Sequence, residues 1–287
     1  MARAARLLVL GFLLTNIYWF ADFDSGSWRL FGVLQRIALV YAACALLMMV
    51  AGSRARLAIA AGILLLYWPL VLLPGLDGLA ADIAQRGHNF AASVDRVLLG
   101  AGNHIYVTGP AGYDPEGLLG TLPAIAQGLI GVAVGEYLLR ATGRGNAGRL
   151  ALAGLAMLVA GLVWSPFFPI IKDIWSSSFV LVTAGATTLV LALLNASIDH
   201  RAVPPGSSLP PWPLRIPIAF GANAIAAYAL HMVTGSLLGW DLLLAPYVLA
   251  REVTSEAIAS LIPIILYMAL IWLAMDYLQR KRWTIKV

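Results

Sequence analysis

Two carboxylates, Asp114 and Glu116, stand directly in front of a nearly uncharged run in the stretch GYDPEGLLGTLPAIAQGLIGVAVGEYLL. A carboxylate at a dry, protein-lined helix mouth can accept a proton from an amine or a hydroxyl, or orient an imidazole such as that of His104. The same pattern also fits a structural role. Asp114 before Pro115 resembles a helix N-cap followed by proline, and the helix dipole favours Glu116 in the first turn. Both roles can coexist, so we predict Asp114, Glu116 and His104 as candidate catalytic residues.

Other candidate ligands lie near the ends of apolar runs. Gln35 and Arg36 fall just inside the run FGVLQRIALVY. An arginine within a membrane is costly and marks a functional site by default, but a long side chain near the interface can also snorkel out to water. Lys172 in WSPFFPIIKDIWSSS has two interpretations as well: contact with an anionic group, or anchoring at the interface beside Trp164 and Trp175. These alternatives stay open.

A later apolar run, IPIAFGANAIAAYALHMVTGSLL, carries Asn223 and His231. On a helix, residues eight apart lie within about 80° of each other and roughly 12 Å apart along the axis. One face could therefore line a polar cavity, although a single histidine in an apolar helix is often a satisfied packing residue. The four histidines show no HxH or HxxxH spacing and the one cysteine has no pair, so no metal site is expected.

Composition shows which elements must position these residues. The 287 residues are 61% hydrophobic and 11% charged, with a mean hydropathy of +0.84, whereas soluble domains carry about a quarter charged residues. A spanning helix needs about 20 mostly apolar residues. The sequence therefore predicts an all-α polytopic membrane protein forming a single transmembrane domain, 1–287. We expect about eight helices, at approximately 5–21, 31–51, 57–74, 118–139, 150–167, 177–194, 216–238 and 257–277.

The distribution of charge predicts the topology. If Arg3 and Arg6 place the N-terminus inside, most of the 19 Lys and Arg residues fall in cytoplasmic connections and most of the 14 Asp and Glu residues fall outside. An even number of helices then puts both ends inside. The net charge of +5 is thereby explained by orientation, and no nucleic-acid partner is expected. A signal peptide is disfavoured for the first segment, because no small-x-small cleavage site follows IYWFADFD.

Two connections are unusually long. The outer loop 75–116 holds many polar side chains, among them Asn103, together with apolar and aromatic residues that indicate packing rather than disorder. The cytoplasmic linker 196–215, rich in Pro, Gly and Ser, separates six predicted helices from two. It is a hinge or simply a loop. We expect the outer loop to be folded and to carry function.

Four stretches in this order resemble the heparan-alpha-glucosaminide N-acetyltransferase family and its bacterial relatives. They are FGVLQRIALVY, DRVLLGAGNHIYVTGPAGYDPEGLLGTLPAIAQGLIGVAVGEYLL, SPFFPIIKDIWSSSFVLVTAG and FGANAIAAYALH. Together they span nearly the whole chain, and the ordered set GNHIY, YDPEG.LGT and K.IWS.S is more specific than any one motif. The resemblance implies that cytoplasmic acetyl-CoA supplies an acetyl group to an amino sugar on the far side of the membrane. It also implies a multi-pass protein of the bacterial inner membrane.

The resemblance has one departure. Members of the family begin with two further helices, and the histidine thought to be catalytic lies in an outer loop after the first, in an H..WNGL...DLV context that this sequence lacks. This chain resembles the family from its third helix onward. There are three explanations: the start of the gene is assigned too late, the protein functions with a separate partner, or it has lost acetyl transfer. His104 does not replace that histidine, because it occupies the family's NH.Y position.

The resemblance and the residues together give a set of expected roles. Asp114 and Glu116 would position the acceptor amine or the missing imidazole, with His104 nearby. The residues expected to bind substrate or acetyl-CoA are Arg36, Gln35, Asn103, Lys172, Asn223 and His231. Within this set, Arg36, Asn223 and His231 would line the acetyl-CoA path, and Lys172 would contact an anionic group.

Two other function classes remain open. A transporter or glycan-exporting component would use the same polar groups to pass a sugar without covalent chemistry, although no internal repeat is evident. A membrane acyltransferase acting on a glycan hydroxyl is the third alternative. The expected partners are an amino sugar or glycan acceptor and the lipid bilayer, and a homo-oligomer is also allowed.

Overall fold

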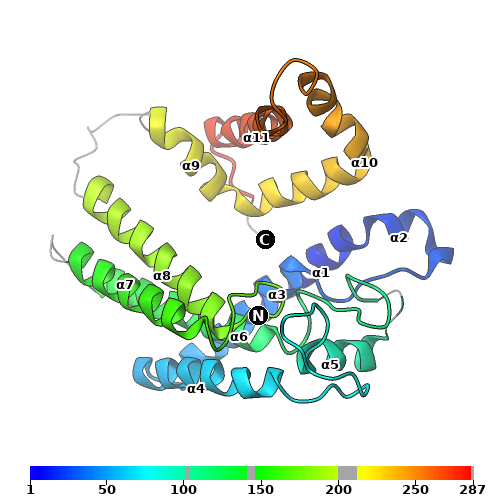
Figure 1. Ribbon diagram of the computed structural model, residues 1–287. Helices are drawn as coiled ribbons and strands as arrows, with labels where there is room; N and C mark the ends of the chain where they lie inside the picture. The colour runs from blue at the N-terminus through cyan, green and yellow to red at the C-terminus, as the bar shows by residue number, and fades with distance from the viewer. Residues whose placement is uncertain (101, 103, 141–145, 200–211, 286–287) are drawn as a thin grey trace. The chain divides into compact units, whose positions relative to one another are not determined.

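Figure 1 shows the computed structural model, which describes residues 1–287 except 101, 103, 141–145, 200–211 and 286–287. The described part of the chain is helical and contains no named strand, only an isolated bridge between Val107 and Tyr113. It divides into two compact units. The first unit comprises 1–12 and 24–202, and the second comprises 13–23 and 203–287.

The first unit contains most of the long apolar helices. They are α1 (Ala2–Thr15, which ends in the second unit), α3 (Val33–Val50), α4 (Ser53–Val71), α5 (Phe90–Leu99), α6 (Thr121–Arg140), α7 (Asn146–Trp164) and α8 (Ser177–Leu194). A π-helical turn, Asn195–Asp199, follows α8. The helix α6 packs against α3, α4 and α8, with Leu64, Leu129 and Val180 in the shared core.

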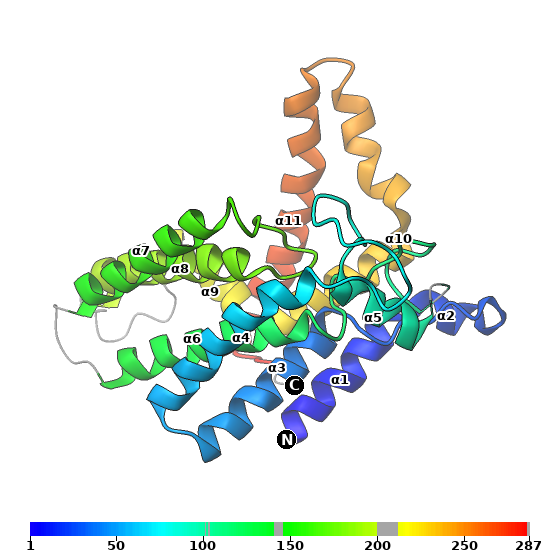
Figure 2. The ribbon, with the colours of Figure 1, turned by 60° about the horizontal axis from the view of Figure 1, so that its bottom comes forward.

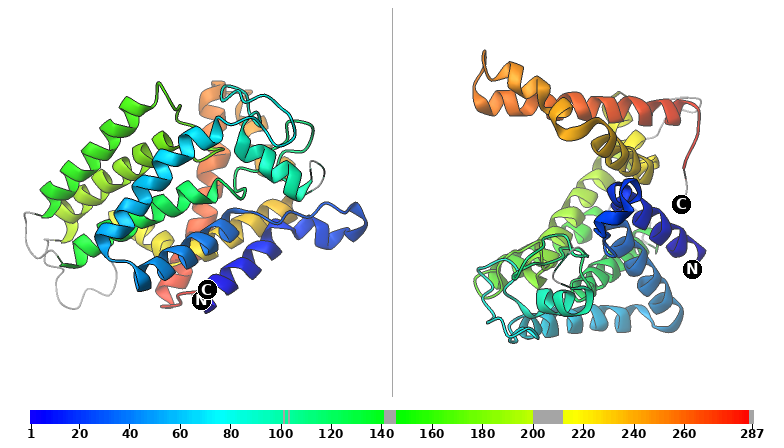
Figure 3. Two further views of the ribbon diagram at one scale, coloured as in Figure 1. Left: turned by 90° about the horizontal axis from the view of Figure 1, so that it is seen from below. Right: turned by 90° about the vertical axis from the view of Figure 1, so that its right-hand side faces the viewer.

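The antiparallel helices α7 and α8 run side by side in both Figure 1 and Figure 3. Glycines allow this close approach. A Cβ added at Gly185 would lie 2.5 Å from the backbone nitrogen of Leu158, and one at Gly154 would lie 2.9 Å from the carbonyl oxygen of Gly185. Small residues let helix backbones approach in this way inside a membrane, where the hydrophobic effect does not drive helix association.

The second unit holds α2 (Ile17–Ala21), α9 (Trp212–Ala222), α10 (Ala224–Ala250) and α11 (Glu256–Arg280). A short 3₁₀ turn, Phe23–Ser25, follows α2. The helices α10 and α11 form an antiparallel hairpin, visible in Figure 2. The core of the second unit contains Ala219 of α9 together with Ala227, Ile271 and Met275 of the hairpin.

The predicted class, an all-α polytopic membrane protein, is confirmed. Among the described residues, six helices are long and apolar enough to cross a membrane, or seven if α9 and α10 together form one span. Eight spans were expected. The first expected segment, 5–21, is interrupted at Asn16 into helices of 14 and five residues, because asparagine disfavours a helix interior. The predicted orientation in the membrane stays a prediction.

The seventh expected helix, 216–238, is not one straight span. The chain bends by 82° at Asn223, between α9 and α10. The side chain of Asn223 accounts for the break. It donates to the carbonyl oxygen of Trp283 at 3.2 Å and accepts from the backbone nitrogen of Ile285 at 2.9 Å, so it ties the break to the C-terminal segment.

The long outer loop is folded around α5. Asn89 caps this helix, its Oδ1 accepting from the backbone nitrogen of Ala92 at 2.9 Å. The buried Arg96 then crosslinks the loop, since its Nη1 donates to the carbonyl oxygens of Gly87 and Gly112 at 2.8 and 2.7 Å. Its Nε donates to Asp77 at 2.5 Å, and this hydrogen bond is the main reason that the pKa of Asp77 is lowered.

Candidate functional site

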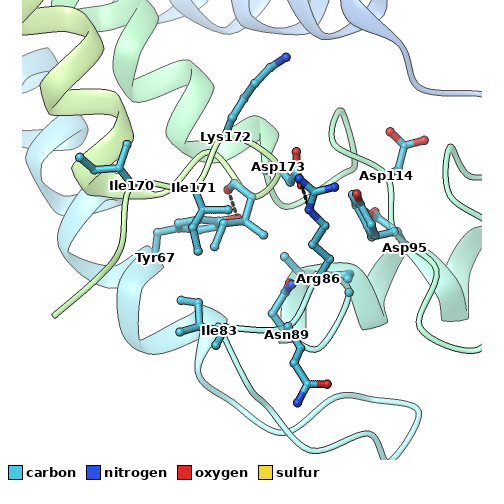
Figure 4. Close-up of a pocket in the computed structure, with 18 residues that line it drawn as sticks. Tyr67, Ile83, Arg86, Asn89, Asp95, Asp114, Ile170, Ile171, Lys172 and Asp173 are labelled. Atoms are coloured by element: carbon cyan, nitrogen blue, oxygen red, sulfur yellow. Dashed lines mark hydrogen bonds and ion pairs between the residues drawn. The ribbon is translucent and has the colours of Figure 1, made fainter. Parts of the chain in front are cut away.

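A cavity of about 440 Å³ lies within the first unit, between the outer loop and the end of α4. We call it the outer cavity. Figure 4 shows its walls. The polar and aromatic side chains around it are Tyr67, Gln85, Arg86, Asn89, Asp95, Tyr113, Asp114, Lys172 and Asp173. They come from segments that are far apart in sequence, and the folded loop brings them together.

Asp95 is the most perturbed acid in this cavity. It sits on α5 with 3% of its surface exposed, and its Oδ1 accepts from the backbone nitrogen of Leu118 at 2.9 Å. Burial raises the pKa of Asp95 to about 7, with a further contribution from the negative charge of Asp114, against the opposing effects of the Leu118 hydrogen bond and nearby arginines. No ion pair joins Asp95 to a cation in the part of the chain that the structure describes. A carboxyl that titrates near neutral pH in a cavity can accept a proton from a substrate.

Asp114 is held quite differently. Arg29 Nε donates to its Oδ2 at 2.8 Å and Arg29 Nη2 to its Oδ1 at 2.5 Å, while Nη2 also reaches Glu116 Oε2 at 2.5 Å. Burial acts to lower the pKa of Arg29, but its hydrogen bonds and charge interactions with both carboxylates leave that pKa raised. One arginine therefore holds both predicted catalytic carboxylates in place. Their charges are already paired, which suits positioning better than proton transfer.

The expectation that Asp114 caps the following helix is wrong. The helix α6 begins at Thr121, so Glu116 does not lie in its first turn either. Instead, Asp114 forms a local turn, because its Oδ1 accepts from the backbone nitrogen of Glu116 at 2.9 Å and its carbonyl oxygen from that of Gly117 at 3.0 Å. This turn places the Asp114 carboxylate at the wall of the outer cavity, where it is bound by Arg29.

Two glycines in the same stretch make room for charged side chains. A Cβ added at Gly117 would overlap the carboxylate of Asp95. One at Gly120 would come within 2.8 Å of Arg36 Nη2. The two glycines of the motif YDPEG.LG therefore allow the carboxylate of Asp95 on α5 and the guanidinium of Arg36 on α3 to approach this stretch closely.

The remaining outer-loop candidates lie elsewhere. His104 Nδ1 is 2.8 Å from the carbonyl oxygen of Trp28, and the two rings are 4.2 Å apart, so His104 contacts Trp28 instead of either predicted carboxylate. It does not line the outer cavity. Asn103 lies outside the described residues. Its predicted role in binding, like the catalytic role of His104, stays a prediction.

A second hollow, of about 610 Å³, opens between α3 and α6 in the first unit. We call it the α3/α6 groove. Arg36 lines it with only 5% of its surface exposed, so this side chain does not snorkel out to water. Its Nη2 donates to the Gly117 carbonyl oxygen at a long 3.4 Å, and its guanidinium lies 4.9 Å from the ring centre of Trp175. Gln35 is also buried but lines neither hollow, and its Nε2 donates to the Leu30 carbonyl oxygen at 3.3 Å.

The K.IWS.S motif builds the wall between these hollows. Lys172 lines both of them. Trp175 has a positive φ of 55° and donates from Nε1 to Gln127 Oε1 at 2.7 Å. Three fully buried serines follow. Ser176 accepts from the backbone of Ile171 at 3.0 Å and donates to the Pro169 carbonyl oxygen at 2.7 Å, which fixes the turn that presents the lysine and the tryptophan.

The polar residues predicted in the seventh helix belong to the second unit. Asn223, with 1% of its surface exposed, is engaged by residues 283 and 285. His231 Nδ1 lies 3.0 Å from the hydroxyl of Tyr267, which also contacts Thr234 Oγ1 at 2.6 Å. The structure thus assigns both side chains partners within their own unit. An acetyl-CoA path shared with Arg36 of the first unit stays a prediction.

Sequence reasoning missed two residues of the site: Asp95, which lines the outer cavity, and Arg29, which pairs with Asp114 and Glu116. Asp95 had a usable signal, since it sits in the short amphipathic segment FAASVDRVLL within a loop expected to be folded. Arg29 gave no local signal, because its partners are 85 and 87 residues away. In the described part of the chain, no three His, Cys, Asp or Glu residues gather as a metal ion would need.

Comparison with known proteins identifies two distant relatives. No family model matches the chain. Over 159 residues it is 30% identical to heparan-alpha-glucosaminide N-acetyltransferase of Mus musculus and 28% identical to that of Homo sapiens. The chain is a distant relative of these two enzymes. Each match covers 50% of this chain but only 23% of the relative, so the matched segment is less than a quarter of a heparan-alpha-glucosaminide N-acetyltransferase.

Proposed function

We propose that this chain takes part in transmembrane N-acetylation, in which cytoplasmic acetyl-CoA supplies the acetyl group and an amino sugar of the glucosamine type accepts it in the outer cavity. The carrying observation is Asp95, a buried carboxyl with a pKa of about 7 in a cavity of about 440 Å³. The distant relationship to the N-acetyltransferases supports the reaction type. A cavity of this volume is within the range of small-molecule sites.

The chemistry needs a base near neutral pH. The neutral amine nitrogen attacks the thioester carbonyl carbon, a C–N bond forms, the C–S bond breaks, and coenzyme A leaves as a thiolate. Asp95 takes the proton released from the amine nitrogen. Because its pKa lies close to working pH, it is substantially ionised before the reaction and still able to hold that proton afterwards.

The other groups at the cavity have positioning roles. Asp114 and Glu116, fixed by Arg29, offer oriented carboxylate oxygens to the hydroxyl groups or the amine of the acceptor. The oxyanion formed in the reaction requires hydrogen-bond donors, and the side chains of Asn89 and Arg86 at the cavity wall are donors of that kind. Arg86 also pairs with Asp173 at 3.2 Å, as the dashed line in Figure 4 shows.

The direct test is acetylation of glucosamine by the purified protein in lipid nanodiscs, with acetyl-CoA as donor. We expect a product that survives mild base, as an amide does and an ester does not. Asp95→Asn should lower kcat/KM by about 10²–10⁴-fold, the usual contribution of a general base. The matched control is Asp24→Asn, the same change at an exposed position.

Other outcomes would point to the other function classes. A base-labile product would indicate an O-acyltransferase. Uptake of labelled glucosamine into vesicles without product would indicate a transporter. Equal loss of activity in Asp95→Asn and Asp24→Asn would remove Asp95 from the mechanism.

A further inference from the structure

The α3/α6 groove is amphipathic along its length. Its lower part, further along α3 and α6 from the residues where these helices begin, is lined by apolar or small residues, namely Ile37, Val40, Cys44, Gly128 and Val132. Its upper part, where α3 and α6 begin, carries the side chains of Arg36, Glu116, Lys172 and Trp175 together with Val33 and Ala124, while Tyr41 and Gln127 line the groove further along the helices. A hollow with an apolar trough and a charged end has the chemistry of a site for an anionic lipid, with an alkyl chain below and a charged headgroup above.

The charge at the upper end is mainly unpaired and positive. Within the described residues no carboxylate forms an ion pair with Arg36 or Lys172. Arg36 Nε and Nη1 are buried without a hydrogen-bond partner. Among the described residues, the acid that lines the groove is Glu116, which is already engaged by Arg29 at 2.5 Å. Burying a guanidinium with unused hydrogen-bond donors costs free energy, and a bound anion would offset this cost. A phosphate matches the forked geometry of the guanidinium.

The groove and the outer cavity adjoin each other. Lys172 lines both hollows. Gly120 lines the outer cavity, and a Cβ there would come within 2.8 Å of Arg36 Nη2, which belongs to the groove. Asp114 and Glu116, two residues apart on one turn, face the cavity and the groove respectively. A group bound at Arg36 is therefore next to whatever occupies the outer cavity.

We propose that the α3/α6 groove binds the phosphate and alkyl chain of a lipid-linked acceptor, so that the amino sugar attached to this phosphate enters the adjoining outer cavity. This inference rests on the proposed function and names its substrate class: an amino sugar joined through a phosphodiester to a membrane lipid. The phosphate contacts Arg36 and Lys172, and the chain lies along α3 and α6. The coenzyme fits this end less well, because its own phosphates would remain on the cytoplasmic side.

The test compares two acceptors, glucosamine and glucosamine linked through phosphate to a dodecyl chain, with acetyl-CoA as donor. We expect wild-type protein to prefer the lipid-linked acceptor by at least about tenfold in kcat/KM. Arg36→Gln should lower that preference by about tenfold or more, as expected when a charged hydrogen bond to phosphate is lost. Arg36→Lys should retain an intermediate preference, because the charge is kept but the forked geometry is not.

A binding measurement keeps the inference separate from catalysis. Dodecyl phosphate, without a sugar, should bind wild-type protein in native mass spectrometry more tightly than zwitterionic dodecylphosphocholine, and Arg36→Gln should remove this difference. The matched control is Arg54→Gln, which changes an exposed arginine on α4 and should leave both the binding difference and the acceptor preference as in wild type. Thermal midpoints of all variants identify any that fail to fold.

Several results would overturn the inference. One is an equal kcat/KM for the two acceptors, and another is an unchanged acceptor preference in Arg36→Gln. A third is that coenzyme A displaces dodecyl phosphate and that Arg36→Gln weakens the binding of both ligands equally. If neither acceptor is acetylated, the proposed function fails. Selective, Arg36-dependent binding of dodecyl phosphate would even then support the lipid site.

Discussion

The buried candidate residues of the two units differ in how completely their polar atoms are satisfied, although Trp272 Nε1 and Gln279 Oε1 of the second unit also lack a hydrogen-bond partner. In the first unit, Asp95 is buried without an ion pair among the described residues, and Arg36 keeps two nitrogens without hydrogen bonds. In the second unit, Asn223 and His231 have side-chain or backbone partners of their own. Leaving buried polar groups unsatisfied costs stability, so such groups persist where they serve a ligand or a reaction. Substitutions at Asp95 or Arg36 should therefore mainly change activity, and those at Asn223 or His231 should mainly change stability.

Among the substitutions that test this contrast, Gly117→Ala should have the largest effect on activity. The added methyl group would overlap the carboxylate of Asp95, so Asp95 must move and lose its hydrogen bond from Leu118. We expect kcat/KM for acetyl transfer to fall by about 10²-fold or more, approaching the loss of the base itself. Gly131→Ala is the control, because a Cβ on that helix meets open space. Activity within a factor of two of wild type in Gly117→Ala would contradict the placement of Asp95.

Arg29→Gln should affect both activity and stability. It leaves Asp114, whose side chain is fully buried, and Glu116 without their shared cation. Removing one partner of a buried ion pair typically costs about 3–5 kcal/mol, and partial exposure of Arg29 reduces this figure. We expect a lowered thermal midpoint together with a raised KM for the acceptor. The control is Arg86→Gln, whose pair with Asp173 is largely exposed and should contribute little to stability. Equal midpoints in the two variants would contradict a structural role for Arg29.

Asn223→Ala tests the second unit. Its side chain makes two hydrogen bonds to the C-terminal segment, so we expect a loss of about 1–3 kcal/mol in the free energy of unfolding. The loss in kcat/KM, measured well below the thermal midpoint, should be smaller than that of Gly117→Ala. If the variant instead had normal stability but a lower affinity for acetyl-CoA, the result would support the prediction that Asn223 lines the acetyl-CoA path.

The pH dependence of stability offers a further test of Asp95. Because the pKa of Asp95 rises from 3.8 in the unfolded chain to about 7 in the folded one, the folded protein holds a proton that the unfolded chain releases between these values. The contribution of this group to stability is present below about pH 4 and is lost as the pH rises through about 7. Asp95→Asn should therefore gain stability relative to wild type from pH 4 to pH 8. A constant difference across that range would contradict the raised pKa.

Periodicity and charge predicted much of the architecture. The helix expected at 177–194 coincides with α8, since its apolar run is bounded by the serine cap Ser176 and by Asn195. The interruptions at Asn16 and Asn223 were missed. A single asparagine in an apolar run leaves the hydropathy almost unchanged, and whether it breaks the helix depends on tertiary partners such as Trp283 and Ile285.

The candidate site was only partly predictable. The sequence drew attention to Asp114, which lines the outer cavity, and to Arg36, which lines the α3/α6 groove, because a charge beside an apolar run is rare enough to be informative. It misjudged the local structure of Asp114, since its cap-like pattern does not reveal that a distant arginine holds the side chain. Asp95 was passed over because its character comes from burial and the charge of Asp114, neither of which sequence spacing records.

The most direct measurement is the pH dependence of kcat/KM for acetyl transfer to one amino-sugar acceptor, in wild type and in Asp95→Asn. Asp95 accepts a proton only when ionised, so wild-type activity should rise with pH through a step near pH 7. The variant should lose this step while keeping any rise that comes from the acceptor amine itself. The same step in both proteins would show that another group takes the proton, and the assignment of Asp95 as the base would fall.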